Sequence, residues 1–368
     1  MKNNSISISL KDDKGLVQGH CSDQFHSVLD SFVENFEKRD EVGASVVVTH
    51  EGETVVDLWG GRSSEATNEA WARDALSVVF SCTKGITGMI ANILIERGLL
   101  DPCQPVADIW PEYATNGKEK TTVRMMLDHT AGVPVLRETV KDNGFYDWDY
   151  MCDLLASQQP YWEPGSKQGY HGVTYGWTVG ELIRRVTGES VGTNIQEILS
   201  KPLGLDLWCG LPEIIIPRVV PLIWPVQGEH DEDRDEVFRL AEEDPTSIPA
   251  QFMFNDGGWL SQQRFDTKES YMCEMPGTNG VSNARGLAGA YRPFALGGSV
   301  DGHKFVGADT LVGMEQISAA TSRDQTLLVR TAFSLGFAKR VDDRRRGTDR
   351  CPLVLGSRAF GHVGAGGS

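Results

Sequence analysis

The stretch Ser81-Cys82-Thr83-Lys84 opens an apolar, helix-forming run that continues as Gly85-Ile86-Thr87-Gly88-Met89-Ile90. Residues three positions apart lie on one face of a helix, about one turn from each other. We therefore expect the hydroxyl of Ser81 and the amine of Lys84 to be neighbours. A serine hydroxyl is a weak nucleophile unless a base lies beside it, and a lysine becomes such a base when burial lowers its pKa. A capped surface helix, with Ser81 as its N-cap, would show the same four residues.

Two later segments favour the chemical interpretation. Gly169-Tyr170-His171-Gly172 places a tyrosine in a loop, and Phe360-Gly361-His362-Val363-Gly364-Ala365-Gly366 is rich in small residues. In this order the three segments resemble the serine β-lactamase and penicillin-binding-protein superfamily. The class C-like branch, which includes the family VIII carboxylesterases, is the most similar. The resemblance runs from about Gly43 to the last residue and also includes Trp59-Gly60-Gly61, Leu127–Pro134, Glu163-Pro164-Gly165 and Gly280–Leu287.

The resemblance implies an α/β (α+β) fold of the β-lactamase/transpeptidase type. It has an antiparallel sheet flanked by helices, and a mostly helical inserted domain. We expect a discontinuous α/β domain from residues 1–98 and 300–368, and a helical domain from 99–299. Apolar patterns predict a helix at 24–38, a hairpin at 44–59 and a strand at 326–338. Residues 229–244 hold nine acidic residues against two arginines, which is typical of a solvated acidic flap.

The family also implies roles for the site residues. Ser81, Lys84 and Tyr170 are the expected catalytic residues: Ser81 attacks a carbonyl carbon, and Tyr170 takes or relays its proton. Because a phenol has a pKa near ~10, a nearby cation must stabilise its phenolate at neutral pH, and Lys84 would be that cation. A developing oxyanion needs two N–H donors. Ser81 would supply one, and the strand that carries the third segment would supply the other.

That second donor is expected near Gly364, at Ala365, and His362 is expected to contact the substrate. Two departures from the family pattern concern recognition. Gly172 stands where class C β-lactamases have the asparagine of Tyr-x-Asn, and His362-Val363-Gly364 stands where they have Lys-Thr-Gly. Losing these donors weakens the binding of a charged amide-like ligand more than that of a neutral ester. The sequence therefore favours a carboxylesterase for small esters, with an acyltransferase, a weak β-lactamase or a peptidase as alternatives.

Members of the family continue for some tens of residues beyond the third segment and supply two more strands and a terminal helix there. The resemblance thus implies that C-terminal strands are missing from this sheet. Backbone edges left open in a sheet are a liability. A non-catalytic pseudoenzyme or binding scaffold is therefore a further alternative.

A second motif, Gly188-Glu189-Ser190-Val191-Gly192, matches the Gly-x-Ser-x-Gly nucleophile elbow of α/β-hydrolases. That elbow requires a strand before the serine and a helix after it. The residues before Gly188 have a helical pattern instead. We therefore interpret Gly188 as the residue that ends a helix and Ser190 as the N-cap of the next. His129 is interpreted as a structural histidine that braces a loop. His171 follows the proposed base directly, so its two interpretations are a structural histidine, which is favoured, and a residue that tunes the base.

Composition limits the partners. The chain has 368 residues and a formal net charge of −16, whereas nucleic acids and anionic membranes bind clustered lysine and arginine. We expect a small-molecule ester or amide as the partner, with no nucleic acid and no membrane, and the oligomeric state stays open. No ligand spacing of a metal site is present, so we expect no metal and no cofactor. Seven scattered cysteines, no secretory signal and no long apolar run favour a cytoplasmic enzyme.

Overall fold

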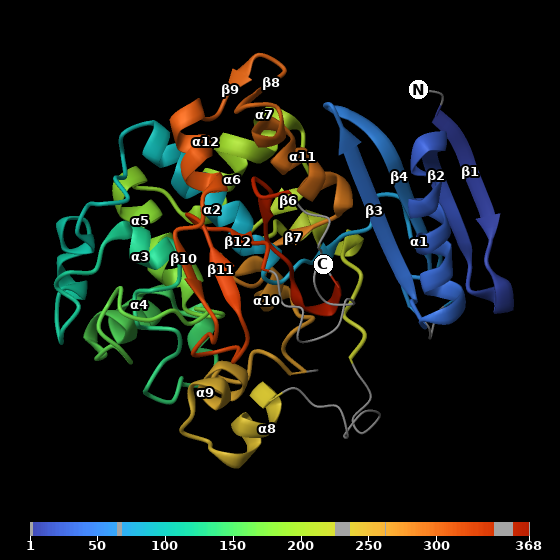
Figure 1. The fold of residues 1–368 in the computed structure, drawn as a ribbon. Helices are drawn as coiled ribbons and strands as arrows, with labels where there is room; N and C mark the ends of the chain where they lie inside the picture. The colour runs from blue at the N-terminus through green and yellow to red at the C-terminus, as the bar shows by residue number, and fades with distance from the viewer. Residues whose placement is uncertain (1–2, 65–67, 225–235, 262, 342–355, 368) are drawn as a thin grey trace.

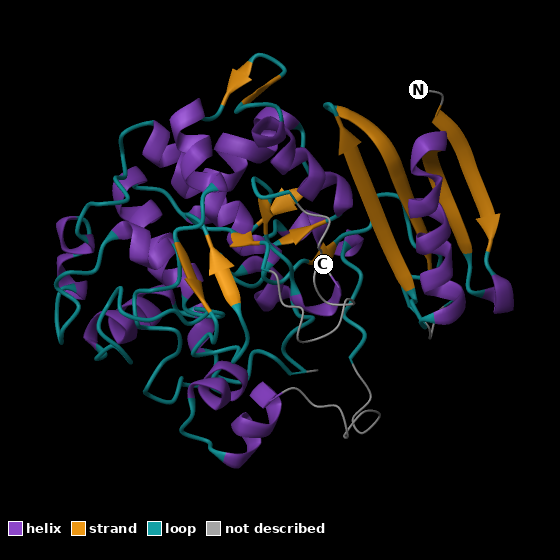
Figure 2. Cartoon of the chain, viewed as in Figure 1, coloured by secondary structure: helices purple, strands orange, loops and turns teal. Residues whose placement is uncertain are grey.

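The computed structural model describes residues 3–64, 68–224, 236–261, 263–341 and 356–367. The N-terminal strands form a four-stranded sheet, and Figure 1 shows this sheet with α1 (His26–Lys38) on its face, beside a larger part built from helices, loops and short strands. Strands dominate the first part and helices the second (Figure 2). The predicted α/β fold with antiparallel sheets and flanking helices is confirmed.

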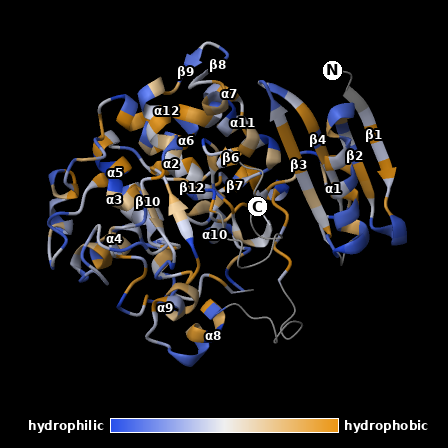
Figure 3. Cartoon of the chain, viewed as in Figure 1, coloured by the Kyte–Doolittle hydropathy of each residue, from blue (hydrophilic) through white to orange (hydrophobic). Residues whose placement is uncertain are grey.

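The N-terminal sheet has the strand order β1-β2-β4-β3, and all neighbouring strands are antiparallel. Hydrophobic residues, orange in Figure 3, recur along its strands. Phe32 and Phe36 of the covering helix α1 share one buried cluster with Val17 and Leu58 of the sheet. The elements are β1 (Asn3–Ser9), β2 (Leu16–Ser22), α1 (His26–Lys38), β3 (Gly43–His50) and β4 (Glu53–Gly61). The predicted helix and hairpin are thus present, and the hairpin β1–β2 is an addition to them.

Helix α2 (Cys82–Glu96) lies at the centre of the larger part (Figure 1). Thirteen of its fifteen residues are buried, as expected for a helix that is apolar on all sides. Its glycines allow neighbouring segments to come close: a Cβ on Gly88 would lie 2.8 Å from the carbonyl oxygen of Gly336. The helix that begins at the serine motif is therefore the core element around which the other helices gather.

The remaining helices surround α2 or connect to it. α5 (Tyr175–Thr187), α6 (Val191–Ile195) and α12 (Ala308–Glu315) contact α2 directly. The others are α3 (Val123–Leu127), α4 (Trp148–Ser157), α7 (Lys201–Leu203), α8 (Glu236–Glu243), α9 (Ile248–Phe254), α10 (Lys268–Met272) and α11 (Ala284–Ala295). In the part of the chain that the structure describes, no helix is long and apolar enough to cross a membrane.

Short strands complete the larger part. One sheet has the order β10-β11-β12-β13, a second has the order β5-β7-β6, and β8 pairs with β9. The strand predicted at 326–338 is shorter than expected, because only 331–333 pair as β11 before a turn at Gly336, which has a φ of 91°. The strands are β5 (Ser77–Val78), β6 (Leu207–Trp208), β7 (Val281–Ser282), β8 (Ser299–Val300), β9 (His303–Lys304), β10 (Ala319–Thr321), β11 (Thr331–Phe333), β12 (Ala338–Lys339) and β13 (Phe360–Gly361).

The division into a discontinuous α/β domain and a helical domain stays a prediction. Of the predicted acidic flap, residues 229–235 lie outside the described residues. Residues 236–243 form α8, which carries both hydrophilic and hydrophobic residues (Figure 3).

Candidate active site

Ser81 occupies the N-cap position of α2, directly after a strained residue. Phe80 has a φ of 42°, an uncommon conformation for a bulky side chain. Its ring stacks on that of Phe265 with the centroids 5.2 Å apart, which holds the turn in place. The Ser81 side chain makes no capping hydrogen bond. Its hydroxyl is therefore free of a helix-capping role and faces two other side chains instead.

The first of these is Lys84, one turn along the helix as predicted. Its Nζ lies 3.0 Å from Oγ of Ser81 and 2.6 Å from the carbonyl oxygens of both Gly172 and Gly277. The side chain is fully buried, and burial lowers the pKa of Lys84 to about 7. A neutral amine has two N–H groups and one lone pair. The two carbonyls can accept both N–H groups, which leaves the lone pair directed at Ser81.

The second is Tyr170, whose hydroxyl donates to Oγ of Ser81 at 2.8 Å. Its ring stacks on Phe333 at an interplanar angle of 9°, and Nζ of Lys84 lies 5.0 Å from its centroid. Burial raises the pKa of Tyr170 above its usual range. The structure thus brings together all three predicted catalytic residues. It also favours a neutral phenol over a standing phenolate, which differs from the ionisation that we expected.

His129 and His171 brace the loop behind Tyr170. The backbone N–H of His171 donates to Nδ1 of His129 at 3.1 Å, and the N–H of Val133 donates to Nε2 of His171 at 3.1 Å. Nδ1 of His171 lies 2.7 Å from the carbonyl oxygen of Gly169. Burial lowers the pKa of both histidines, to about 4 for His171. Both rings are thus hydrogen-bonded within the loop, as the structural interpretation expects.

Asp324 is a residue of this site that the sequence did not predict. Both of its carboxylate oxygens accept the backbone N–H of Tyr170 at 3.0 Å. The carboxylate also accepts the N–H groups of Thr326 and Leu327 and the hydroxyl of Thr331. Asp324 is buried, and burial raises its pKa in spite of these donors. It lies in a loop far from Tyr170 in sequence and matches no motif, so only the fold could reveal it.

The third segment reaches the site through His362. Sγ of Cys82 donates to the carbonyl oxygen of His362 at 3.3 Å, which ties this segment to the start of α2. The His362 ring lies 5.9 Å from that of Tyr170. Its Nδ1 is 2.7 Å from the carbonyl oxygen of Val363, and its buried Nε2 has no hydrogen-bond partner among the described residues. Burial and the charge of Lys84 lower the pKa of His362 to about 3, so the ring is neutral at physiological pH.

The second oxyanion donor was expected on the strand that carries the third segment, near Gly364 and at Ala365, but both residues follow that strand instead of lying in it. Strand β13 ends at Gly361, and Ala365–Gly367 form a short 3₁₀ turn in which Gly366 has a φ of 75°. Ala365 and Gly366 line a cavity of about 400 Å³ together with Phe80, so the segment does lie beside the serine turn. The roles of Gly364 and Ala365 toward an oxyanion stay predictions.

The competing serine lies in a helix cap. Oγ of Ser190 accepts the N–H of Thr193 at 3.1 Å at the start of α6 and donates to Glu274 at 2.7 Å. Gly188 ends α5 with a φ of 75°. A helix, not a strand, precedes Ser190, so the nucleophile-elbow interpretation fails. Within the described ranges, no three His, Cys, Asp or Glu side chains gather closely enough to hold a metal ion.

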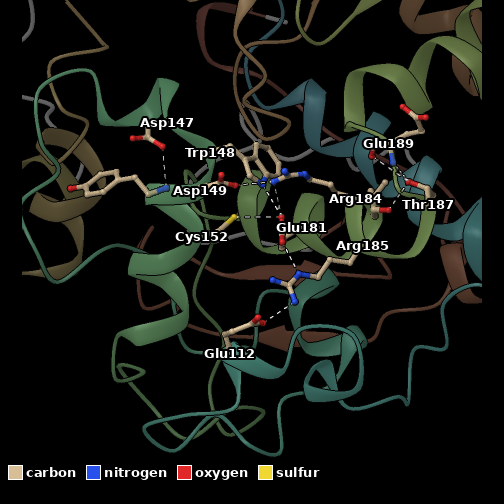
Figure 4. A network of polar contacts seen from close by, with 12 residues as sticks. Glu112, Asp147, Trp148, Asp149, Cys152, Glu181, Arg184, Arg185, Thr187 and Glu189 are labelled. Atoms are coloured by element: carbon tan, nitrogen blue, oxygen red, sulfur yellow. Dashed lines mark hydrogen bonds and ion pairs between the residues drawn. The ribbon is translucent and has the colours of Figure 1, made fainter.

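A network of charged groups anchors α5, the helix that follows the Tyr170 loop (Figure 4). Glu181 is buried and accepts Nε1 of Trp148 at 2.7 Å and Nε of Arg185 at 2.6 Å. Arg184 lies 3.7 Å from the same carboxylate and 3.1 Å from Asp149. A buried carboxylate is stable only when paired in this way. The network joins α4 to α5 and so supports the loop that presents Tyr170.

Comparisons with known proteins identify the family of this chain. A family model described as Beta-lactamase matches residues 29–368. The chain is 33% identical over 359 residues to the protein named esterase/beta-lactamase LipL from Mycobacterium tuberculosis, covering 96% of this chain and 79% of that protein.

Two solved structures are similar over nearly the whole chain. A family VIII carboxylesterase is 34% identical with a TM-score of 0.82, over 96% of this chain and 89% of that one. A penicillin-binding-protein homologue from Caulobacter crescentus is 32% identical with a TM-score of 0.81, over 95% of this chain and 88% of that one.

Proposed function

Because the chain belongs to the beta-lactamase family, we propose that it is a serine hydrolase that forms an acyl-enzyme at Ser81 and acts as a carboxylesterase on small esters. The observation that carries the proposal is the contact of one hydroxyl, Ser81 Oγ, with both Lys84 Nζ at 3.0 Å and the Tyr170 hydroxyl at 2.8 Å. A nucleophile beside a buried amine of lowered pKa is the arrangement that acyl transfer requires.

In the first half of the reaction, Oγ of Ser81 forms a bond to the ester carbonyl carbon and gives its proton to neutral Lys84. Tyr170 donates its proton to the alcohol oxygen as the carbon–oxygen bond of the ester breaks, and Lys84 returns a proton to Tyr170. In the second half, the oxygen of a water molecule bonds to the acyl carbon and its proton passes to the same groups. The bond between the acyl carbon and Oγ of Ser81 then breaks, Oγ takes up that proton, and the carboxylic acid leaves. Ser81 Oγ lies within hydrogen-bond distance of both Lys84 and Tyr170, and Nζ of Lys84 lies 5.0 Å from the centroid of the Tyr170 ring, so the three proton-carrying groups are close together.

The neutral site favours esters over β-lactams. His362 occupies the position at which a fixed cation would grip a substrate carboxylate, and its lowered pKa leaves the ring uncharged. A carboxylate placed beside a neutral imidazole gains no charge-assisted hydrogen bond from it. The similarity to a family VIII carboxylesterase supports the same choice.

Labelling with a fluorophosphonate followed by peptide mass spectrometry tests the nucleophile. We expect the adduct on Ser81 and none in the Ser81→Ala variant. An adduct on Ser190 would overturn the assignment.

Turnover of p-nitrophenyl acetate and nitrocefin should then be compared in the same preparation. If nitrocefin were turned over faster than p-nitrophenyl acetate, the proposed activity would be that of a β-lactamase and not of an esterase.

A further inference from the structure

The ring of Phe252 occupies the space in which a side chain at position 172 would lie. Phe252 belongs to α9, and its ring is half-buried. The three atoms nearest to a Cβ built on Gly172 all belong to this ring, at 2.1, 2.8 and 2.9 Å. The φ of Gly172 lies outside the left-handed region, so its backbone would accept other residues. The Phe252 ring therefore supplies the nearest obstacles to a side chain at position 172.

The same ring contacts the catalytic machinery. It meets the ring of Tyr170 edge to face, with the centroids 6.2 Å apart and the planes at 78°. Gly172, beside which the ring lies, accepts a hydrogen bond from Nζ of Lys84 at its carbonyl oxygen, at 2.6 Å. Phe252 thus covers the segment that positions both proton-carrying groups. The ring carries no hydrogen-bond donor or acceptor, so the contact that it makes with Tyr170 is apolar.

Helix α9 is held at both ends, so this ring has a fixed place. At the start, the hydroxyl of Ser247 accepts the N–H of Ala250 at 3.2 Å. After the end, Oδ1 of Asn255 accepts the N–H of Val140 at 2.8 Å, and Nδ2 donates to the carbonyl oxygen of Glu138 at 2.8 Å. A side chain on an anchored helix is positioned more precisely than one on a free loop.

We propose that Phe252, acting as one unit with Gly172, is the specificity-determining residue that limits the length of the acyl group. The ring forms an apolar wall beside the Ser81–Tyr170 pair. Short, unbranched acyl groups fit against it, and longer ones collide with it. Acyl groups with a polar amide find no partner there and lose affinity, because a desolvated amide without a partner is costly. The inference rests on the proposed esterase function.

The test is the chain-length profile of kcat/KM for p-nitrophenyl esters from acetate to octanoate. In Phe252→Ala we expect the octanoate-to-acetate ratio to rise at least about tenfold, since discrimination by a pocket wall is of this order per group. Phe252→Leu should give a smaller shift in the same direction. Phe254→Ala is the matched control: Phe254 lies on the same helix with 64% exposure, so its removal should leave the ratio unchanged.

A double-mutant cycle tests whether Phe252 and Gly172 act together. Gly172→Ala alone should lower kcat/KM for every ester at least about tenfold, because its Cβ would collide with the ring and displace the Tyr170 segment. Gly172→Ala combined with Phe252→Ala should recover most of that loss, since contacting residues are not additive. If the effects of the two substitutions on kcat/KM were fully additive, Phe252 and Gly172 would not act together.

Thermal melts and fluorophosphonate labelling accompany each variant. If the wild-type protein takes no label on Ser81, the proposed function fails. If folded Phe252→Ala and Phe252→Leu are labelled on Ser81 and keep the wild-type ratio, only the role of Phe252 fails. An equal shift in Phe254→Ala would also overturn that role. If Phe252→Ala does not fold, the Phe252→Leu profile decides.

Discussion

Tyr170 donates its backbone N–H to both carboxylate oxygens of Asp324, at 3.0 Å each, across 154 positions of sequence. The phenol that touches Ser81 is therefore placed by an acid in a distant loop. The hydrogen bonds of Asp324 reach Tyr170, Thr326, Leu327 and Thr331, and not Ser81 or Lys84, so it acts through Tyr170 as a positioning residue.

Asp324→Asn should lower both stability and activity. An amide has one acceptor oxygen, and its NH₂ group would face backbone N–H donors. We expect a loss of about 1–3 kcal/mol in unfolding free energy, the usual cost of an unsatisfied buried group. Displacement of Tyr170 should lower kcat on the order of 10- to 100-fold. Urea unfolding and ester kinetics measure the two effects.

Asp128→Asn provides the control for that variant. Asp128 is also buried, and it accepts the hydroxyls of Thr130 and Ser318 at 2.6 Å, away from Tyr170. The Asp128→Asn variant should lose about as much unfolding free energy as Asp324→Asn and keep most of the wild-type kcat. Equal loss of kcat in the two variants would show that Asp324 has no special role in positioning Tyr170.

Tyr170→Phe should preserve the fold and remove the proton relay. The ring contacts with His129 and Phe333 remain, and only the hydroxyl is lost. We expect kcat to fall on the order of 10²–10⁴-fold, the usual range for general acid–base catalysis. Steady-state ester kinetics and a thermal melt check this result. A variant with wild-type kcat would show that Tyr170 carries no proton.

The parts of the site that the sequence could predict are local or belong to a family motif. Ser81 and Lys84 are neighbours because helical spacing alone brings positions three apart together. Tyr170 could be named only through the resemblance. The ionisation of the pair was not predictable, because it depends on complete burial of Lys84 beneath two carbonyls from distant segments.

Long-range contacts account for what the sequence analysis missed. Asp324 and Phe252 reach Tyr170 from loops and helices whose sequences contain no motif. Ala365 was expected on the strand of the third segment, but β13 ends at Gly361 and Ala365 lies in the 3₁₀ turn that follows. The short strand β11 fell inside a longer apolar run in which only Gly336 hinted at a turn.

Ser190→Ala should affect stability and leave catalysis unchanged. The substitution removes an N-cap acceptor and the contact with Glu274, so we expect a loss of about 0.5–2 kcal/mol in unfolding free energy. Ser81→Ala should abolish ester turnover and leave the unfolding free energy nearly unchanged, since the Ser81 hydroxyl makes no capping bond and is the proposed nucleophile. Chemical denaturation and ester kinetics measure both effects in the two variants. Loss of kcat in Ser190→Ala with wild-type kcat in Ser81→Ala would contradict the assignment of Ser81 as the nucleophile.

The lowered pKa of Lys84 predicts how activity depends on pH. The neutral amine is the form that accepts the proton of Ser81, so kcat/KM should rise with pH through about 7 and then level off. Because Lys84 and Tyr170 are coupled through Ser81, the midpoint belongs to the pair and not to either residue. A bell-shaped profile with its maximum below pH 6 would contradict a neutral lysine base.

The same shift predicts how Lys84 affects stability. The pKa of Lys84 is about 7 in the folded protein and 10.5 in its unperturbed state, so between these values the unfolded chain binds the extra proton. The contribution of Lys84 to the unfolding free energy must therefore increase as pH rises from about 7 to 10.5, by up to about 1.4 kcal/mol per pH unit. Lys84→Met removes the titration, so the difference in unfolding free energy between wild type and variant should change with pH by this slope. Urea unfolding from pH 7 to 10 measures that difference. A difference that is independent of pH would show that Lys84 keeps its ordinary pKa in the folded protein.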